Sequence, residues 1–102
     1  GVAIDSPLDG QVFAQDGLTV EVSVSANATV DVVAVHQDGS NSTSAALVIT
    51  ASGSYGVILE QGVNTLYARA ISNETGETTE SQRIFVIRQD PTEAGNKSLL
   101  IT

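Results

Sequence analysis

The stretch from Leu18 to Ser25 alternates apolar and polar residues without interruption. Its apolar members are Leu18, Val20, Val22 and Val24, and its polar members are Thr19, Glu21, Ser23 and Ser25. Because successive side chains of a β-strand point to opposite faces, this alternation predicts a strand with one buried face and one solvated face. No window of similar length keeps the period of about 3.6 residues that a helix requires. The chain is therefore predicted to be all-β.

Further stretches rich in Val, Ile and Thr follow at short intervals. We expect strands at residues 2–5, 11–14, 30–36, 45–50, 55–60, 63–72 and 79–88. Between them lie pairs that favour tight turns, namely Asp9-Gly10, Asp16-Gly17, Asp38-Gly39, Ser52-Gly53, Gln61-Gly62 and Thr75-Gly76. About seven short strands with turns roughly every 8–12 residues predict a β-sandwich of two antiparallel sheets. At 102 residues the chain is long enough for one hydrophobic core.

The alternation also predicts which side chains face that core. Within residues 63–72 we expect Leu66, Ala68 and Ala70 to point inward and Thr65, Tyr67 and Arg69 to point outward. Tyr55, Val57 and Leu59 are expected in the same core. Residues 32–35 are apolar on both faces, so they belong either to a covered central strand or to an exposed patch.

The order of several residues resembles a known family. The chain opens with Ile4-x-x-Pro7-x-x-Gly10-x-x-Phe13 and later reads Gly53-x-Tyr55-x-Val57-x-Leu59, then Gly62-x-Asn64-x-Leu66-x-Ala68-x-Ala70. Over about residues 2–88 this pattern resembles the bacterial immunoglobulin-like modules, especially the domain B type of glucodextranase-like enzymes, which is also repeated in surface proteins. The resemblance implies an immunoglobulin-like β-sandwich over residues 1–89, within a larger extracellular or cell-surface protein of bacterial or archaeal origin. Asn64 is then expected to hydrogen-bond the backbone at a corner.

Composition narrows the possible partners. Twelve acidic residues against four basic ones give a formal net charge of −8, which opposes contact with nucleic-acid phosphates and with anionic membrane surfaces. No apolar run approaches the roughly 20 residues that span a bilayer, so no direct membrane insertion is expected. The chain has no cysteine, which favours a bacterial or archaeal exterior over a disulfide-bonded eukaryotic one.

A catalytic site is not expected. His36 is the single histidine, and Asp38 and Ser40 follow it closely. A nucleophile with its base could be assembled from such residues, but they are common in turns, and an ordinary partly exposed histidine is the preferred interpretation. One histidine without cysteine is also a weak signal for zinc. We therefore predict a protein that is not an enzyme.

Calcium is the one cofactor that the acidic residues suggest. Asp9, Asp16 and Asp90 are the candidate ligands, because each lies in an expected turn or tail and carboxylates are calcium ligands. In surface arrays of the family, cations bind at the junctions between modules. The competing interpretation is that Asp-Gly pairs form turns and that the acids keep the surface soluble.

A small exposed patch is a candidate contact for a glycan or a protein partner. Tyr67 and Phe85 are expected to point outward on neighbouring strands, beside Arg69. A cross-strand pair that serves stability or domain contact explains the same residues.

The end of the chain differs from the rest. Residues 90–98 have the polar, Pro- and Gly-containing composition of a linker. Residues 99–102 are again strand-like, and Leu99, Leu100 and Ile101 are expected to begin a following element or to pair with a sheet edge. The sheet edge could belong to this domain or to a neighbouring molecule, and either alternative implies a neighbour, which fits neighbouring domains of the same polypeptide or a repeat array.

Three non-catalytic functions remain open from the sequence. The first is a structural spacer or interaction module of a cell-surface or secreted protein, such as an adhesin stalk. The second is a carbohydrate-binding or accessory module of a secreted glycoside hydrolase. The third is a protein-assembly domain that acts through an exposed strand or the C-terminal tail.

Overall fold

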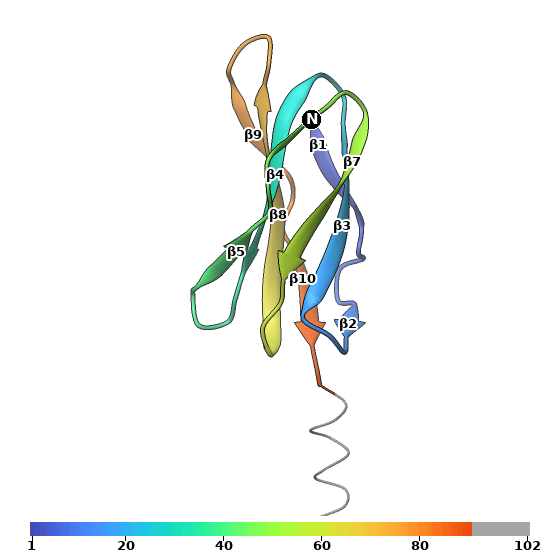
Figure 1. The fold of residues 1–102 in the computed structure, drawn as a ribbon, viewed down its shortest axis with the longest axis vertical. Coiled ribbons are helices and arrows are strands. Elements are labelled where there is room, and N and C mark those ends of the chain that lie inside the picture. The colour runs from blue at the N-terminus through green and yellow to red at the C-terminus, as the bar shows by residue number, and fades with distance from the viewer. Residues whose placement is uncertain (91–102) are drawn as a thin grey trace, which may run out of the picture.

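The structure, a computed structural model, describes residues 1–90 and is all-β over that range (Figure 1). Its strands are β1 (Val2–Ser6), β2 (Val12–Phe13), β3 (Gly17–Val24), β4 (Ala28–Val35), β5 (Asn41–Thr43), β6 (Leu47–Ile49), β7 (Ser52–Ile58), β8 (Gly62–Ser72), β9 (Thr78–Glu80) and β10 (Ile84–Arg88). The described residues include no helix long and apolar enough to cross a membrane. The predicted linker beyond residue 90 and the segment with Leu99, Leu100 and Ile101 lie outside the described residues.

The strands form two sheets, an arrangement compatible with a β-sandwich. The smaller sheet has the order β1-β3-β7, and the larger has the order β2-β10-β8-β4-β5, with β6 also on β4 and β9 also on β8. The two-sheet, all-β prediction is confirmed. One detail of it is wrong: β2 pairs with β10 in parallel, whereas the other pairs are antiparallel.

The described chain has ten strands, more than the seven or so that were predicted, and buried serines explain part of the difference. The predicted strand at residues 79–88 is divided at Ser81, whose amide donates to the carbonyl of Ala68 at 2.9 Å. The Ser81 hydroxyl accepts from the amide of Ala68, also at 2.9 Å. The Ser81 hydroxyl thus takes the place of a backbone carbonyl as the acceptor. The strand pairing is interrupted there, since β9 ends at Glu80 and β10 begins only at Ile84.

Ser44 has the same role on the other side of the larger sheet. It lies between β5 and β6. Its amide donates to the carbonyl of Val32, and its hydroxyl oxygen accepts from the amide of Val32, each at 2.9 Å. Val32 of β4 lies directly opposite Ala68 of β8. Both flanking strands of the β4–β8 pair are therefore interrupted at the same level of the sheet.

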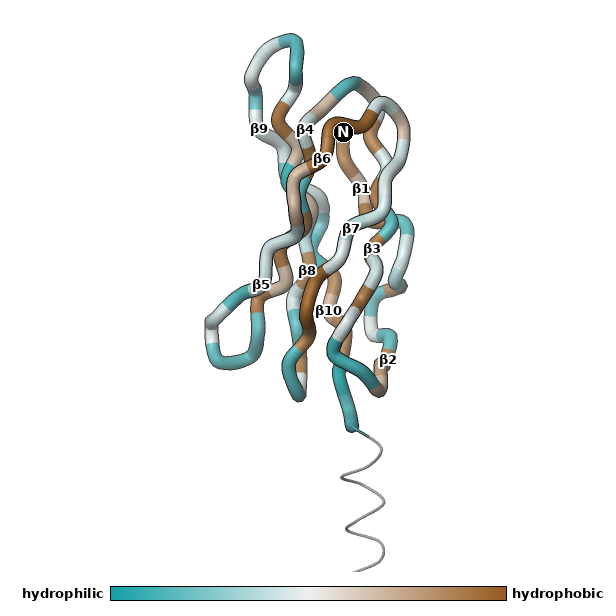
Figure 2. The backbone as a smooth tube through the Cα atoms, viewed as in Figure 1, coloured by the Kyte–Doolittle hydropathy of each residue, from teal (hydrophilic) through white to brown (hydrophobic). Residues whose placement is uncertain are grey.

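The core lies between the two sheets and has the predicted inward-facing residues. Buried apolar side chains come from β3, β4, β6, β7, β8 and β10, and from Leu59 directly after β7. They include Val20, Val22, Val30, Val32, Ile49, Tyr55, Val57, Leu66, Ala68, Ala70 and Val86. The sequence left open whether residues 32–35 form a covered central strand or an exposed patch. They belong to β4, which has neighbours on both sides, and even Val33 on its outer face is only 3% exposed, so the first alternative is correct. Figure 2 shows apolar residues along the strands and hydrophilic residues gathered in the loops at both ends.

The first and last described strands reach opposite ends of the molecule. Val2 at the start of β1 pairs with Val24, at the end of β3. Arg88 at the end of β10 pairs with Gly62, the first residue of β8. In Figure 1 the N-terminus accordingly lies at the top, and β10 leads out at the bottom.

Candidate functional site

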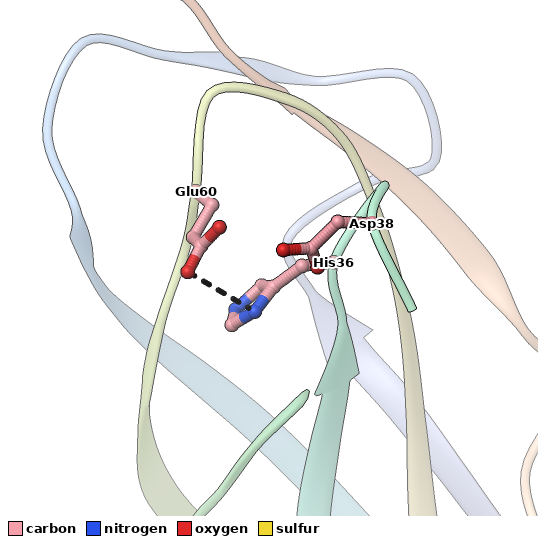
Figure 3. Close-up of side chains that lie close together, drawn as sticks. All are labelled: His36, Asp38 and Glu60. Carbon is pink, nitrogen blue, oxygen red and sulfur yellow. Dashed lines mark ion pairs between the residues drawn. The ribbon is translucent and has the colours of Figure 1, made fainter. Parts of the chain in front are cut away.

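Two turns meet beside the start of β8 and bring together three side chains that could hold a cation (Figure 3). His36 and Asp38 belong to the turn between β4 and β5, and Glu60 belongs to the turn between β7 and β8. One potential ligand atom from each lies within 4.8 Å of the others, and no other such group is found in residues 1–90.

His36 is buried, and its hydrogen bonds define which ring nitrogen faces the group. It directly follows β4 and is 7% exposed. Its Nε2 atom lies 2.8 Å from the carbonyl oxygen of Ile58. Because a carbonyl oxygen can only accept, Nε2 carries a hydrogen. In the neutral ring, Nδ1 therefore holds the lone pair.

Oxygen atoms surround this lone pair. Ser40 Oγ lies 3.1 Å and Glu60 Oε1 lies 3.6 Å from His36 Nδ1. The hydroxyl of Ser40 has a single hydrogen, and its shortest contact is with Asp38 Oδ1 at 2.6 Å. Since a hydroxyl bond to a carboxylate is charge-assisted, that hydrogen goes to Asp38. Nδ1 thus faces two oxygen atoms that offer it no hydrogen.

Asp38 is held as a carboxylate by its own turn. The Ser40 hydroxyl, and after it the Ser40 amide at 2.9 Å, donate to Asp38 and hold the pKa of that carboxyl below its ordinary value of 3.8. This side chain caps the turn at Gly39, in agreement with the turn predicted from Asp38-Gly39.

Glu60 is positioned through its backbone by Asn64, which is fully buried. The side-chain oxygen of Asn64 accepts from the Glu60 amide at 3.0 Å. Its side-chain nitrogen donates to the carbonyls of Glu60 at 2.9 Å and Gly62 at 3.1 Å. The predicted role of Asn64 as a backbone-bonding corner residue is confirmed.

A second contact fixes the two turns against each other. The amide of Val63 donates to Gln37 Oε1 at 3.0 Å. Gly62 has a φ of +95°, and a Cβ atom there would lie only 2.1 Å from the same Gln37 oxygen. The positive φ at the start of β8 thus favours glycine, and a larger residue there would have to displace the Gln37 side chain from the Val63 amide.

The aspartates predicted to bind calcium lie elsewhere. Asp9 Oδ1 accepts from the amide of Phe85 at 2.8 Å, and the backbone carbonyl of Asp16 accepts from Leu59 at 2.7 Å. Asp90 is the last described residue. The three do not form a group like that of His36, so calcium stays a prediction.

The predicted contact patch lies on the outer face of the larger sheet. Phe85 is 52% exposed on β10, and the Arg83 guanidinium lies 4.2 Å from the ring centroid of Tyr67. Arg69 donates two hydrogen bonds to Asp31, at 2.8 and 2.7 Å. A hollow of about 300 Å³ beside Arg69 is lined by Thr29, Val30, Asp31, Ala46, Arg69, Ile71 and Thr78, and by neither aromatic residue.

Sequence reasoning noted His36 and Asp38 but missed Glu60. Glu60 lies far from them along the chain, and only the pairing of β4 with β8 brings its turn to theirs. The available signal was the Gln61-Gly62 turn, which follows Glu60 directly.

No protein-family model matches this chain. No curated protein matches its sequence either.

Proposed function

We propose that this chain is a non-catalytic structural module with an immunoglobulin-like fold, which acts as a spacer in a larger extracellular protein. The observation that carries the proposal is the placement of the first and last strands at opposite ends of the molecule (Figure 1). A domain of this kind extends an array by its own length each time it is repeated, because each copy passes the chain onward in one direction.

Strand order supports the immunoglobulin-like part of the proposal. In that fold, strands C, F and G are neighbours in one sheet and A, B and E belong to the other. Here β4, β8 and β10 are neighbours in the larger sheet, and β1, β3 and β7 form the smaller one. The initial segment also contributes to both sheets, through β1 and β2.

The use of buried polar side chains supports a structural role. Four polar residues are buried among the described residues: His36, Ser44, Asn64 and Ser81. Each bonds to backbone atoms of a strand or turn. These buried polar side chains are thus used to hold the backbone in place.

Tandem repetition tests the spacer proposal. Proteins of one, two and three copies of the 102-residue chain, joined head to tail, should show a maximum dimension in small-angle X-ray scattering that rises by a constant increment with each copy. If the second and third copies instead add mass without adding length, the copies fold back on one another, and the spacer proposal is wrong.

The same tandem proteins test calcium at the junctions. If Asp9, Asp16 or Asp90 contributes to a junction site, millimolar calcium should raise the Tm of the two-copy protein relative to the same protein in EDTA. An equal Tm in both solutions removes calcium from the proposal and leaves the spacer role intact.

A further inference from the structure

We propose that His36, Asp38 and Glu60 form a binding site for a divalent first-row transition-metal ion, with Zn²⁺ as the ion that their chemistry suits best. This site goes beyond the spacer role, which does not require a metal. It lies where the turn after β4 meets the turn after β7 (Figure 3).

The first argument is electrostatic. His36 Nδ1 lies 3.6 Å from Glu60 Oε1, and one potential ligand atom from each of His36, Asp38 and Glu60 lies within 4.8 Å of the others. These atoms accept hydrogen bonds, and the hydrogen of the neighbouring Ser40 hydroxyl is already given to Asp38 at 2.6 Å. Electron-pair donors that face one another in this way repel, and a cation among them removes the repulsion.

The second argument is that the ligands are held in advance. His36 donates Nε2–H to the carbonyl of Ile58, which is the usual outer contact of a metal-bound histidine and fixes the tautomer that a metal needs. The Ser40 amide holds Asp38, and Asn64 holds the backbone of Glu60 on both sides. His36 and Asp38 thus need little further ordering, and the metal would mainly have to order the Glu60 side chain, which is 53% exposed.

The ligand set indicates the class of ion. Calcium and magnesium prefer sites made of oxygen atoms alone. An imidazole nitrogen with two carboxylates suits zinc, which takes three protein ligands and leaves a fourth position for water. The ion would differ from the calcium predicted for Asp9, Asp16 and Asp90 in both chemistry and place.

Such an ion would connect the two sheets. His36 and Asp38 follow β4 of the larger sheet, whereas Glu60 follows β7 of the smaller one. In a chain without cysteine, a metal at this position would hold the sheets together at one end, as a disulfide does in other small domains.

The single histidine makes the site directly observable. Titration of the 102-residue chain with ZnCl₂ should give one binding event per chain by calorimetry. The imidazole nitrogen signals of His36 should shift in step with that event in NMR spectra. Zinc at about ten times its Kd should also raise Tm by several degrees.

Variants distinguish zinc binding at this site from nonspecific attraction of zinc to the acidic surface. Glu60→Gln and Asp38→Asn each keep the size of the side chain and should weaken zinc binding at least tenfold. Glu77→Gln removes the same charge from an exposed residue of the turn between β8 and β9 and should leave the affinity unchanged.

Three outcomes would overturn the proposal. The first is no shift of the imidazole signals at millimolar zinc. The second is an equal effect of Glu60→Gln and Glu77→Gln on the affinity. The third is calcium binding that shifts the imidazole signals as strongly as zinc does, because a nitrogen ligand should not favour calcium.

Discussion

Replacing Asn64 by alanine should destabilise the domain more than its small size suggests. The side chain is fully buried and makes three hydrogen bonds to the backbone, two with Glu60 and one with Gly62. Asn64→Ala removes all three and leaves an amide and two carbonyls of the turn to find water or remain unpaired.

The size of the loss follows from these bonds. At about 1 kcal/mol of net stability each, three bonds are worth about 3 kcal/mol. For a domain of this size, that lowers Tm by roughly 12–24 °C. With a denaturant slope of about 1–3 kcal/mol per molar urea, the unfolding midpoint falls by roughly 1–3 M.

Equilibrium urea unfolding, followed by far-ultraviolet circular dichroism, measures the effect. Asn73→Ala is the matched control, because Asn73 accepts a single exposed side-chain bond from Thr29 at 3.0 Å. Its loss should stay below about 1 kcal/mol. Equal losses in Asn64→Ala and Asn73→Ala would refute the reasoning.

Asn64→Asp sharpens the test. An aspartate keeps the bond from the Glu60 amide but cannot donate to the two carbonyls, and it places a charge in a buried position. At neutral pH it should therefore be less stable than Asn64→Ala. The opposite order would contradict this expectation and show that the bond accepted from the Glu60 amide outweighs the cost of the buried charge.

Three shorter predictions can be checked with the same protein. Gly62→Ala should lose about 1 kcal/mol more than Gly76→Ala in urea unfolding. Both glycines have positive φ, but only a Cβ atom at Gly62 would displace the Gln37 oxygen that accepts from the Val63 amide. Equal losses would mean that moving the Gln37 side chain costs nothing. Tyr55→Phe should leave stability unchanged or raise it, since the hydroxyl is buried and has no hydrogen-bond partner among the described residues; a loss above about 1 kcal/mol would reveal a partner. Ser40→Ala should return the pKa of Asp38 toward 3.8 in an NMR titration, because it removes the hydroxyl bond that lowers this pKa most. The bonds from Ser40 stabilise the fold at pH values above 3.8, and this stability is lost as the pH falls through the lowered pKa of Asp38. An unchanged titration midpoint would contradict the assigned cause.

The alternation of apolar and polar residues and the turn residues predicted those parts of the fold that depend on neighbours in sequence. The alternation from Leu18 places Val20 and Val22 in the core, and β3 covers nearly the whole predicted stretch. The inward set of β8 follows from the same alternation, and the corner bonds of Asn64 were expected from the resemblance to the immunoglobulin-like modules. In these places one side chain and its near neighbours in sequence decide the outcome.

Long-range contacts decided the rest. Nothing near Ser81 in the sequence shows that its hydroxyl will bond the amide of Ala68 and end β9, because the choice depends on a strand already in place. The parallel pairing of β2 with β10 joins residues 12–13 to residues 87–88, which are far apart in the sequence. Glu60 entered the candidate site for the same reason, through the packing of one turn on another.

The interrupted strands have a consequence for how copies of this domain behave beside one another. A long unpaired strand at the rim of a sheet is a template on which another chain can add, and such pairing starts aggregation. In the described part of the larger sheet, one rim consists of β5 and β6, with three residues each. The other consists of β9 with three residues and β2 with two.

Between β9 and β2, the rim of β10 is also occupied. The amide of Phe85 is bonded by Asp9 and its carbonyl by Gly10. An incoming strand could therefore make only a few consecutive bonds with the larger sheet before the rim changes direction or is already filled. In an array, where identical domains are held at high local concentration, short rims of this kind would let neighbours touch without merging their larger sheets.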